Sequence, residues 1–147
     1  MIHLTQQGYF SERGDTGMLT LCICLDDRNG LQFNKRRQSR DIRVLEDMAA
    51  SCSGELLIGP YSEKLVQEAG IPCRVTAENA VKEGLYFAEA IPSEALMAVT
   101  DTLVVYRWNR HYPADVRWEI PAGFTLAETS RFPGKSHEKV TKEVYTR

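Results

Sequence analysis

A basic stretch at residues 34–40 holds the side chains with the clearest capacity for chemistry. It contains three arginines, whose planar charged groups suit phosphate and carboxylate ligands. The stretch follows an apolar segment that we expect to be a strand, and ligands collect at the carboxyl ends of strands in open α/β sheets. We therefore interpret it as a candidate site for a small anionic ligand, a nucleotide or an acidic partner, the alternative being a solvated charged loop. The candidate residues are Asn34, Arg36, Arg37, Gln38, Ser39 and Arg40.

A second group of aromatic and cationic residues spans 106–112. A planar ligand or an exposed base could stack on Trp108, with Asn109 and Arg110 beside it. Alternatively, these side chains face the core and cover the edge of a sheet. His137 is a further candidate, as an acid or base, because imidazole changes charge near neutral pH. A lone histidine in a loop is more often incidental.

Several classes of function lack support in the sequence. The net charge of −2 gives no basic field, so nucleic-acid binding stays an unsupported possibility. The four cysteines lack the paired CxxC spacing of a zinc site, and we expect no metal. There is no P-loop, GxSxG or GxGxxG motif. The absence of a secretory signal and of a long apolar segment predicts a cytoplasmic protein that does not contact membranes.

The length of 147 residues, 43% of them hydrophobic, predicts one domain over residues 18–147. Residues 1–17 end in a breaker-rich stretch and are expected to be an appendage, which leaves open whether Met1 or Met18 is the true start. Expected strands cover 19–25, 55–59, 71–75, 85–91 and 102–108. Helices are expected between them: one capped by Ser39 that ends near Gly54, one from Ser62 to Gly70, a short one over 76–84 and one over 93–99. This alternation predicts a parallel sheet, and segments 124–129 and 140–145 predict an antiparallel pair at its edge.

This order of elements, with local matches, resembles the dihydrofolate reductase family. The matching segments are 21–30, Leu56-Leu57-Ile58-Gly59, 101–106, 114–118, 124–129 and 142–147. The resemblance implies a three-layer α/β fold with a mostly parallel sheet and an antiparallel C-terminal strand pair. It also implies that Asp41, or less favourably Asp47, takes the place of the carboxylate that binds the pterin and supports its protonation. The alternative for Asp41 is a simple favourable interaction with the helix dipole.

The departures from the family pattern bear on function. Glu89-Ala90 stands where the family has a glycine pair that lets the diphosphate of NADPH approach the main chain. A basic segment replaces a Leu-Pro-Trp segment of the folate pocket, and Pro60 stands where an arginine is usual. We therefore expect a degenerate bacterial relative without a cofactor, a non-catalytic or regulatory binding protein. The alternatives are an NADPH-dependent reductase of a pterin-like or other heterocyclic substrate, or an RNA-binding protein. In the reductase, Asp41 would support protonation of the substrate, and Arg36 or Arg37 would bind the cofactor phosphate in a rebuilt site.

A fainter resemblance, in the basic and Trp-Asn-Arg segments, is to bacterial proteins labelled ribonuclease Z. That activity needs a dense cluster of histidines and carboxylates around two metal ions. His3, His111 and His137 are too far apart in the sequence to fit such a cluster. The sequence therefore does not support that label.

Overall fold

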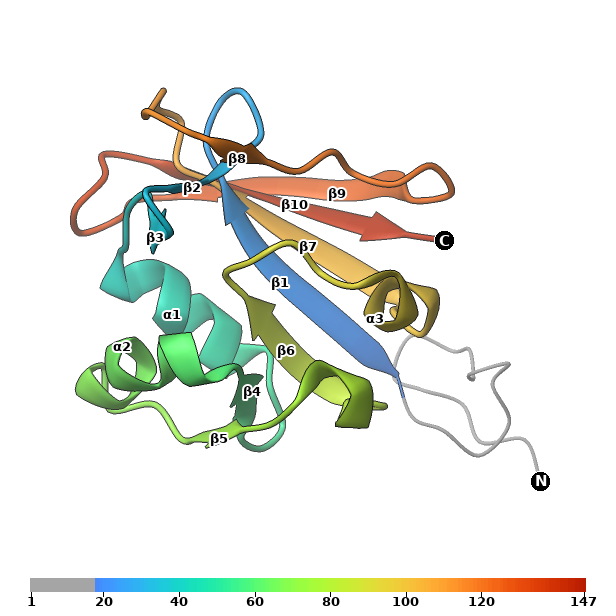
Figure 1. The fold of residues 1–147 in the computed structure, drawn as a ribbon. Coiled ribbons are helices and arrows are strands. Elements are labelled where there is room, and N and C mark those ends of the chain that lie inside the picture. The colour runs from blue at the N-terminus through green and yellow to red at the C-terminus, as the bar shows by residue number, and fades with distance from the viewer. Residues whose placement is uncertain (1–17) are drawn as a thin grey trace.

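The computed structural model describes residues 18–147, so the expected appendage of residues 1–17 lies outside the described residues (Figure 1). The large sheet is built from β1 (Leu19–Leu25), β4 (Leu56–Ile58), β5 (Cys73–Val75), β6 (Gly84–Ala88), β7 (Thr102–Arg107), β9 (Thr125–Phe132) and β10 (Val140–Thr146). The helices are α1 (Ile42–Ala50), α2 (Glu63–Glu68) and α3 (Glu94–Ala98), with 3-10 turns η1 (Pro60–Ser62) and η2 (Glu78–Ala80). A small second sheet contains β2 (Gly30–Phe33), β3 (Arg36–Arg37) and β8 (Val116–Arg117).

The strand order in the large sheet is β5-β4-β6-β1-β7-β10-β9. The first five of these strands pair in parallel, and β10 pairs antiparallel with both β7 and β9. This confirms the predicted α/β class, including the antiparallel C-terminal pair. No helix in the described part of the chain is long and apolar enough to cross a membrane.

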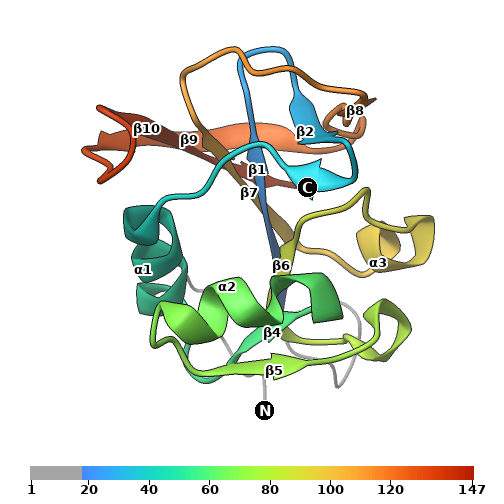
Figure 2. The ribbon, with the colours of Figure 1, turned by 60° about the vertical axis from the view of Figure 1, so that its left-hand side comes forward.

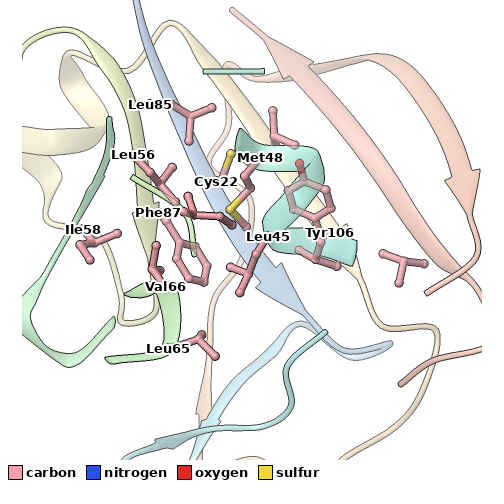
Figure 3. Close-up of a cluster of buried hydrophobic side chains, with 14 of the residues drawn as sticks. Cys22, Leu45, Met48, Leu56, Ile58, Leu65, Val66, Leu85, Phe87 and Tyr106 are labelled. Carbon is pink, nitrogen blue, oxygen red and sulfur yellow. The ribbon is translucent and has the colours of Figure 1, made fainter. Parts of the chain in front are cut away.

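Both faces of β1 are buried, which explains its continuously apolar sequence. Cys22 belongs to one core, between the sheet and helices α1 and α2, and Leu21 and Ile23 belong to the other, on the side of α3. Figure 3 shows Leu45 and Met48 of α1 and Val66 of α2 meeting Phe87 and Cys22 of the sheet. The central strand β1 therefore packs into a core on each face of the sheet, and this packing fixes the position of its carboxyl end.

The start of α1 differs from the sequence-based expectation. Asp41, not Ser39, is the N-cap, and its carboxylate accepts a hydrogen bond from the backbone N–H of Arg43 at 2.9 Å. Either residue type can cap a helix. The Ser39 hydroxyl instead lies near His137, as described below. The helix also ends at Ala50, before the expected end near Gly54.

The small sheet was not expected from the sequence, which predicted a loop across the basic stretch. Asn34 and Lys35 connect β2 to β3 with φ angles of 53° and 60°. Two consecutive positive φ values are typical of the tightest hairpin turns, and asparagine adopts them readily whereas lysine does not. The hairpin presents Arg36 and Arg37 from a strand at the carboxyl end of β1, and Figure 2 shows the chain passing from it to α1.

Candidate functional site

The candidate site lies where the chain's crossovers change side of the large sheet. The connection after β1 leads to α1 on one face, and the connection after the neighbouring strand β6 leads to α3 on the other (Figure 1). The carboxyl ends of two such strands form the crevice in which α/β proteins usually bind their ligands. Cys24 on β1 and Glu89, just after β6, lie at this crevice.

An ion pair between Arg37 and Glu89 crosses the crevice. Arg37 donates from Nε and Nη2 to the two carboxylate oxygens of Glu89 at 2.7 and 2.8 Å. Ser62 donates its hydroxyl to the same carboxylate at 2.8 Å, and the Glu89 side chain is only 9% exposed. The guanidinium also lies over the ring of Tyr61, 4.5 Å from its centroid. The hydrogen bonds that Arg37 donates to Glu89 raise the pKa of Arg37, although burial of the guanidinium opposes this.

These side chains leave little space at the crevice. The hollow between Cys24, Arg37, Glu89 and Trp108 measures about 10 Å³, which is room for about one water molecule. The diphosphate of a dinucleotide binds to main-chain N–H groups that no side chain covers, where the electrostatic potential is positive. At this crevice the negatively charged carboxylate of Glu89 lies in that place. The residues present therefore do not fit NADPH in the manner that the family resemblance implies.

The carboxylate of Asp41 is enclosed by donors from the loop between β9 and β10. Its Oδ1 accepts from the backbone of Lys135, and its Oδ2 accepts from the backbones of Ser136 and His137 and from Nδ1 of His137, all at 2.8 to 3.0 Å. Burial works to raise the pKa of Asp41, but the hydrogen bonds, from Lys135 and His137 above all, outweigh it and lower the pKa to about 2. Asp41 is therefore ionised and faces the interior of the protein, with both oxygens engaged.

Gly134 permits this close wrapping of the loop around the carboxylate. A Cβ atom at this position would lie 2.6 Å from Oδ2 of Asp41 and 2.7 Å from the carbonyl oxygen of His137. Both distances are well inside van der Waals contact, so a side chain would push the loop off the carboxylate.

His137 links this loop to the basic stretch. Its ring is buried and stacks on Trp108, with the centroids 4.5 Å apart and the planes at 17°. Its Nε2 lies 3.0 Å from the hydroxyl of Ser39 and 3.0 Å from that of Tyr112. Ser39, His137 and Asp41 thus form a continuous chain of hydrogen bonds, in which His137 comes from a segment far in the sequence from the other two.

A second buried carboxylate, that of Asp26, fixes the loops beside this chain. It accepts hydrogen bonds from the backbones of Arg28, Gly30 and Tyr112 and from Nε2 of Gln38. Burial works to raise its pKa, but these bonds lower it overall. Gln38 and Tyr112 are therefore held in place, and both line an opening at this end of the sheet.

That opening is a cavity of about 440 Å³ over the basic stretch. Its wall is formed by Phe33, Asn34, Arg36, Arg37, Gln38, Tyr112 and Pro113. Among the described residues, Arg36 has no acidic partner, in contrast to Arg37. Phe33 is 43% exposed, and Oε1 of Gln38 is buried without a hydrogen-bond partner in the described part of the chain.

The structure separates the other candidates from this cavity. Arg40 lines a different cavity of about 300 Å³ beside Lys135. Trp108 is buried, so its ring is not offered to a ligand, and Asn109 bonds to Lys139 and Thr141 near the start of β10. Arg110 is exposed. Asp47 lies on α1 and contacts Tyr106 and Lys142.

Several residues of the site escaped the sequence-based reasoning. Glu89 and its two partners, Arg37 and Ser62, lie in three separate segments of the chain. No local sequence pattern links these segments. Tyr112 was noted only within an aromatic run. The one available signal for Asp26 is an acidic residue directly after a buried strand, a position from which a carboxylate reaches the loops at the sheet's edge.

Among the residues that the structure describes, no group of three or more histidine, cysteine or acidic side chains is placed to hold a metal ion. The four cysteines are free thiols. Burial raises the pKa of Cys22 and of Cys24, so these two thiols stay protonated and pack as small apolar groups.

Comparison with known proteins bears on the fold. No family model matches the sequence, and no curated protein matches it. The fold is similar to that of dihydrofolate reductase from Enterococcus faecalis in complex with NADP(H) and RAB-propyl. The TM-score is 0.62 and the sequence identity 12%, over 88% of this chain and 96% of that chain. The chain thus has a dihydrofolate reductase-like fold, as the sequence resemblance predicted, and at this identity the similarity extends to the fold alone.

The ion pair at the crevice gives a first prediction. Arg37→Met leaves the Glu89 carboxylate buried without its partner and should lower the free energy of unfolding by about 3–5 kcal/mol. The double variant Arg37→Met/Glu89→Leu should be distinctly more stable than the single one, because no charge is left unpaired. Urea unfolding measures both. Arg43→Met, which removes an exposed pair with Glu46, is the matched control and should cost about 1 kcal/mol or less. Equal losses in the single and double variants would contradict this account.

The depressed pKa of Asp41 gives a second prediction. Because the carboxylate is a stronger acid in the folded protein than in the unfolded chain, its stabilising effect is complete above about pH 4 and is lost as the pH falls towards 2. Asp41→Asn should cost on the order of 3 kcal/mol at pH 7, and its deficit against the wild type should shrink below pH 4. Unfolding by urea at pH 7, 4 and 3 tests this. Asp27→Asn, at an exposed position, should show no deficit at any of these pH values, and a constant deficit for Asp41→Asn would refute the assignment.

Proposed function

We propose that this protein is a binding or regulatory protein without reductase activity on a dihydrofolate reductase-like scaffold, and that the cavity over residues 33–38 holds a small anionic ligand such as a nucleotide. The observation that carries the proposal is the contrast between two places at the same end of the sheet. The crevice used by nucleotide-binding α/β folds is filled by an ion pair, and the adjacent cavity is open and lined by an arginine without an acidic partner in the described residues.

The side chains of the cavity wall indicate which chemical groups the ligand would carry. Arg36 offers a forked donor for a phosphate or carboxylate. Phe33 offers an exposed apolar ring against which a planar group can lie. Oε1 of Gln38 is buried and is not presented to the cavity. A small molecule with an anionic group and a planar ring matches the two exposed groups, and a nucleoside monophosphate is of this kind.

The two alternatives receive less support. A reductase would use Asp41 to assist proton transfer to its substrate, but both carboxylate oxygens are engaged by the loop at 135–137. RNA binding through stacked bases would use Trp108, whose ring packs on His137 in the interior. The proposed binding role, in contrast, uses side chains that are exposed in the cavity, namely Arg36 and Phe33.

A thermal-shift titration with AMP tests the proposal. AMP should raise the melting temperature of the wild-type protein in a saturable way, because a ligand that binds the native state stabilises it by mass action. Arg36→Ala should reduce the affinity for AMP at least tenfold, since a charge-assisted hydrogen bond contributes about 1.5–3 kcal/mol. Adenosine, which lacks the phosphate, should bind much more weakly than AMP.

The matched control is Arg131→Ala, which removes an exposed arginine on β9. This variant should bind AMP as the wild type does. If AMP, pyrophosphate and AMP analogues all leave the melting temperature unchanged, or if the two arginine variants respond alike, this cavity is not the binding site.

A further inference from the structure

We propose that Ser39 is an activated nucleophile that accepts the acyl group of a small carboxylic ester, with His137 as its general base and Asp41 as the positioning residue for His137. The proposal rests on the proposed function in one respect, that the anionic part of the ester lies in the cavity of Arg36. Its chemistry stems from Ser39 and Asp41, which are two residues apart before α1, and from His137, which the fold brings into line with them from the loop before β10.

The geometry is that of a serine–histidine–aspartate arrangement. The hydroxyl of Ser39 lies 3.0 Å from Nε2 of His137, and Nδ1 of His137 lies 2.9 Å from Oδ2 of Asp41. These distances are within the hydrogen-bond range that such nucleophile–base pairs need. The arrangement is recognised by the roles of its members rather than by their order or by the fold that carries it.

The direction of the hydrogen bonds follows from the acidity of Asp41. An ionised carboxylate only accepts, so Nδ1 of His137 carries a proton, and in the neutral imidazole Nε2 is then the acceptor. Ser39 can then donate to Nε2 while Tyr112 donates to Oγ of Ser39, from 3.4 Å. In this assignment each of the hydroxyl groups has a partner, and the serine proton points at the base that would remove it.

The histidine is also held in one orientation. Its ring stacks on Trp108 and meets Tyr112 edge-on, with centroids 4.5 and 6.4 Å apart. Its backbone N–H is bonded to the same carboxylate as its side chain. A base that cannot rotate away from its nucleophile is preorganised for proton transfer.

A substrate can approach from the cavity of the proposed binding function. Ser39 is partly exposed, and Tyr112 belongs both to the cavity wall and to the hydrogen-bonded chain. Two hollows next to Ser39, each of about 10 Å³, have room for about one water molecule. Ser39 does not line the cavity of Arg36, so the reacting carbonyl of the ester would reach it past Gln38 and Tyr112 of the cavity wall. A water molecule has space beside the serine.

The reaction balances without a cofactor. Oγ of Ser39 bonds to the acyl carbon as its proton passes to Nε2 of His137, the ester C–O bond breaks, and the alcohol leaves with that proton. Water then adds to the acyl carbon and gives a proton to His137. The bond to Oγ breaks, the carboxylic acid leaves, and Ser39 regains its proton.

Covalent labelling of the full chain with diisopropyl fluorophosphate tests the proposal. The reagent is uncharged, so its reaction does not depend on anion binding at Arg36. We expect one adduct per molecule, located at Ser39 by peptide mass mapping, and none on Ser39→Ala. His137→Gln should slow labelling at least ~1000-fold, and Tyr112→Phe, which keeps the ring beside His137, should leave it within about tenfold. Ser130→Ala, on the exposed strand β9, should label as the wild type does.

Circular dichroism and thermal unfolding establish that each variant is folded. If His137→Gln fails to fold, the comparison of wild type with Ser39→Ala in the hydrolysis of p-nitrophenyl acetate decides, with an initial burst expected only for the wild type. A folded wild-type protein that shows no adduct at Ser39, or one no faster than at other serines, overturns the proposal. Labelling that persists in Arg36→Ala while AMP binding is absent even in the wild type would remove the proposed binding function and leave the nucleophile.

Discussion

The ion pair between Arg37 and Glu89 determines what the carboxyl end of this sheet can do. Two charges with low exposure are tolerable only because the contact is bidentate and Ser62 satisfies a further lone pair. The pair joins the β2–β3 hairpin to the end of β6 and fills the crevice at the carboxyl ends of β1 and β6. The chain has a dihydrofolate reductase-like fold in which this crevice is closed by an ion pair.

The enclosed carboxylate of Asp41 has a comparable organising role on the neighbouring side. It caps α1, gathers the loop between β9 and β10, and orients His137 toward Ser39. One buried charge thus ties the first helix to the last hairpin. The family resemblance assigned this carboxylate to substrate, whereas here it acts within the protein, and any chemistry it supports passes through the imidazole of His137.

Much of the fold was predictable because its signals are local. The continuous apolar run of β1, the Ser93 cap of α3 and the alternation of strands and short helices each follow from neighbouring residues. The small sheet was missed because β3 is only two residues long and the turn before it, at Asn34 and Lys35, has two positive φ angles. The site was predictable only as a region. Arg36 and Gln38 were identified from the basic stretch, but the pairing of Arg37 with Glu89 and of Ser39 with His137 depends on how distant segments pack, which no spacing in the sequence encodes.

We expect the ion pair that fills the crevice to exclude a nicotinamide dinucleotide. The direct measurement is a calorimetric titration of the wild-type protein with NADPH. The account predicts no saturable heat up to concentrations in the high micromolar range, because the diphosphate would have to displace a buried carboxylate and its arginine partner. Saturation with one NADPH per chain at micromolar affinity would contradict it.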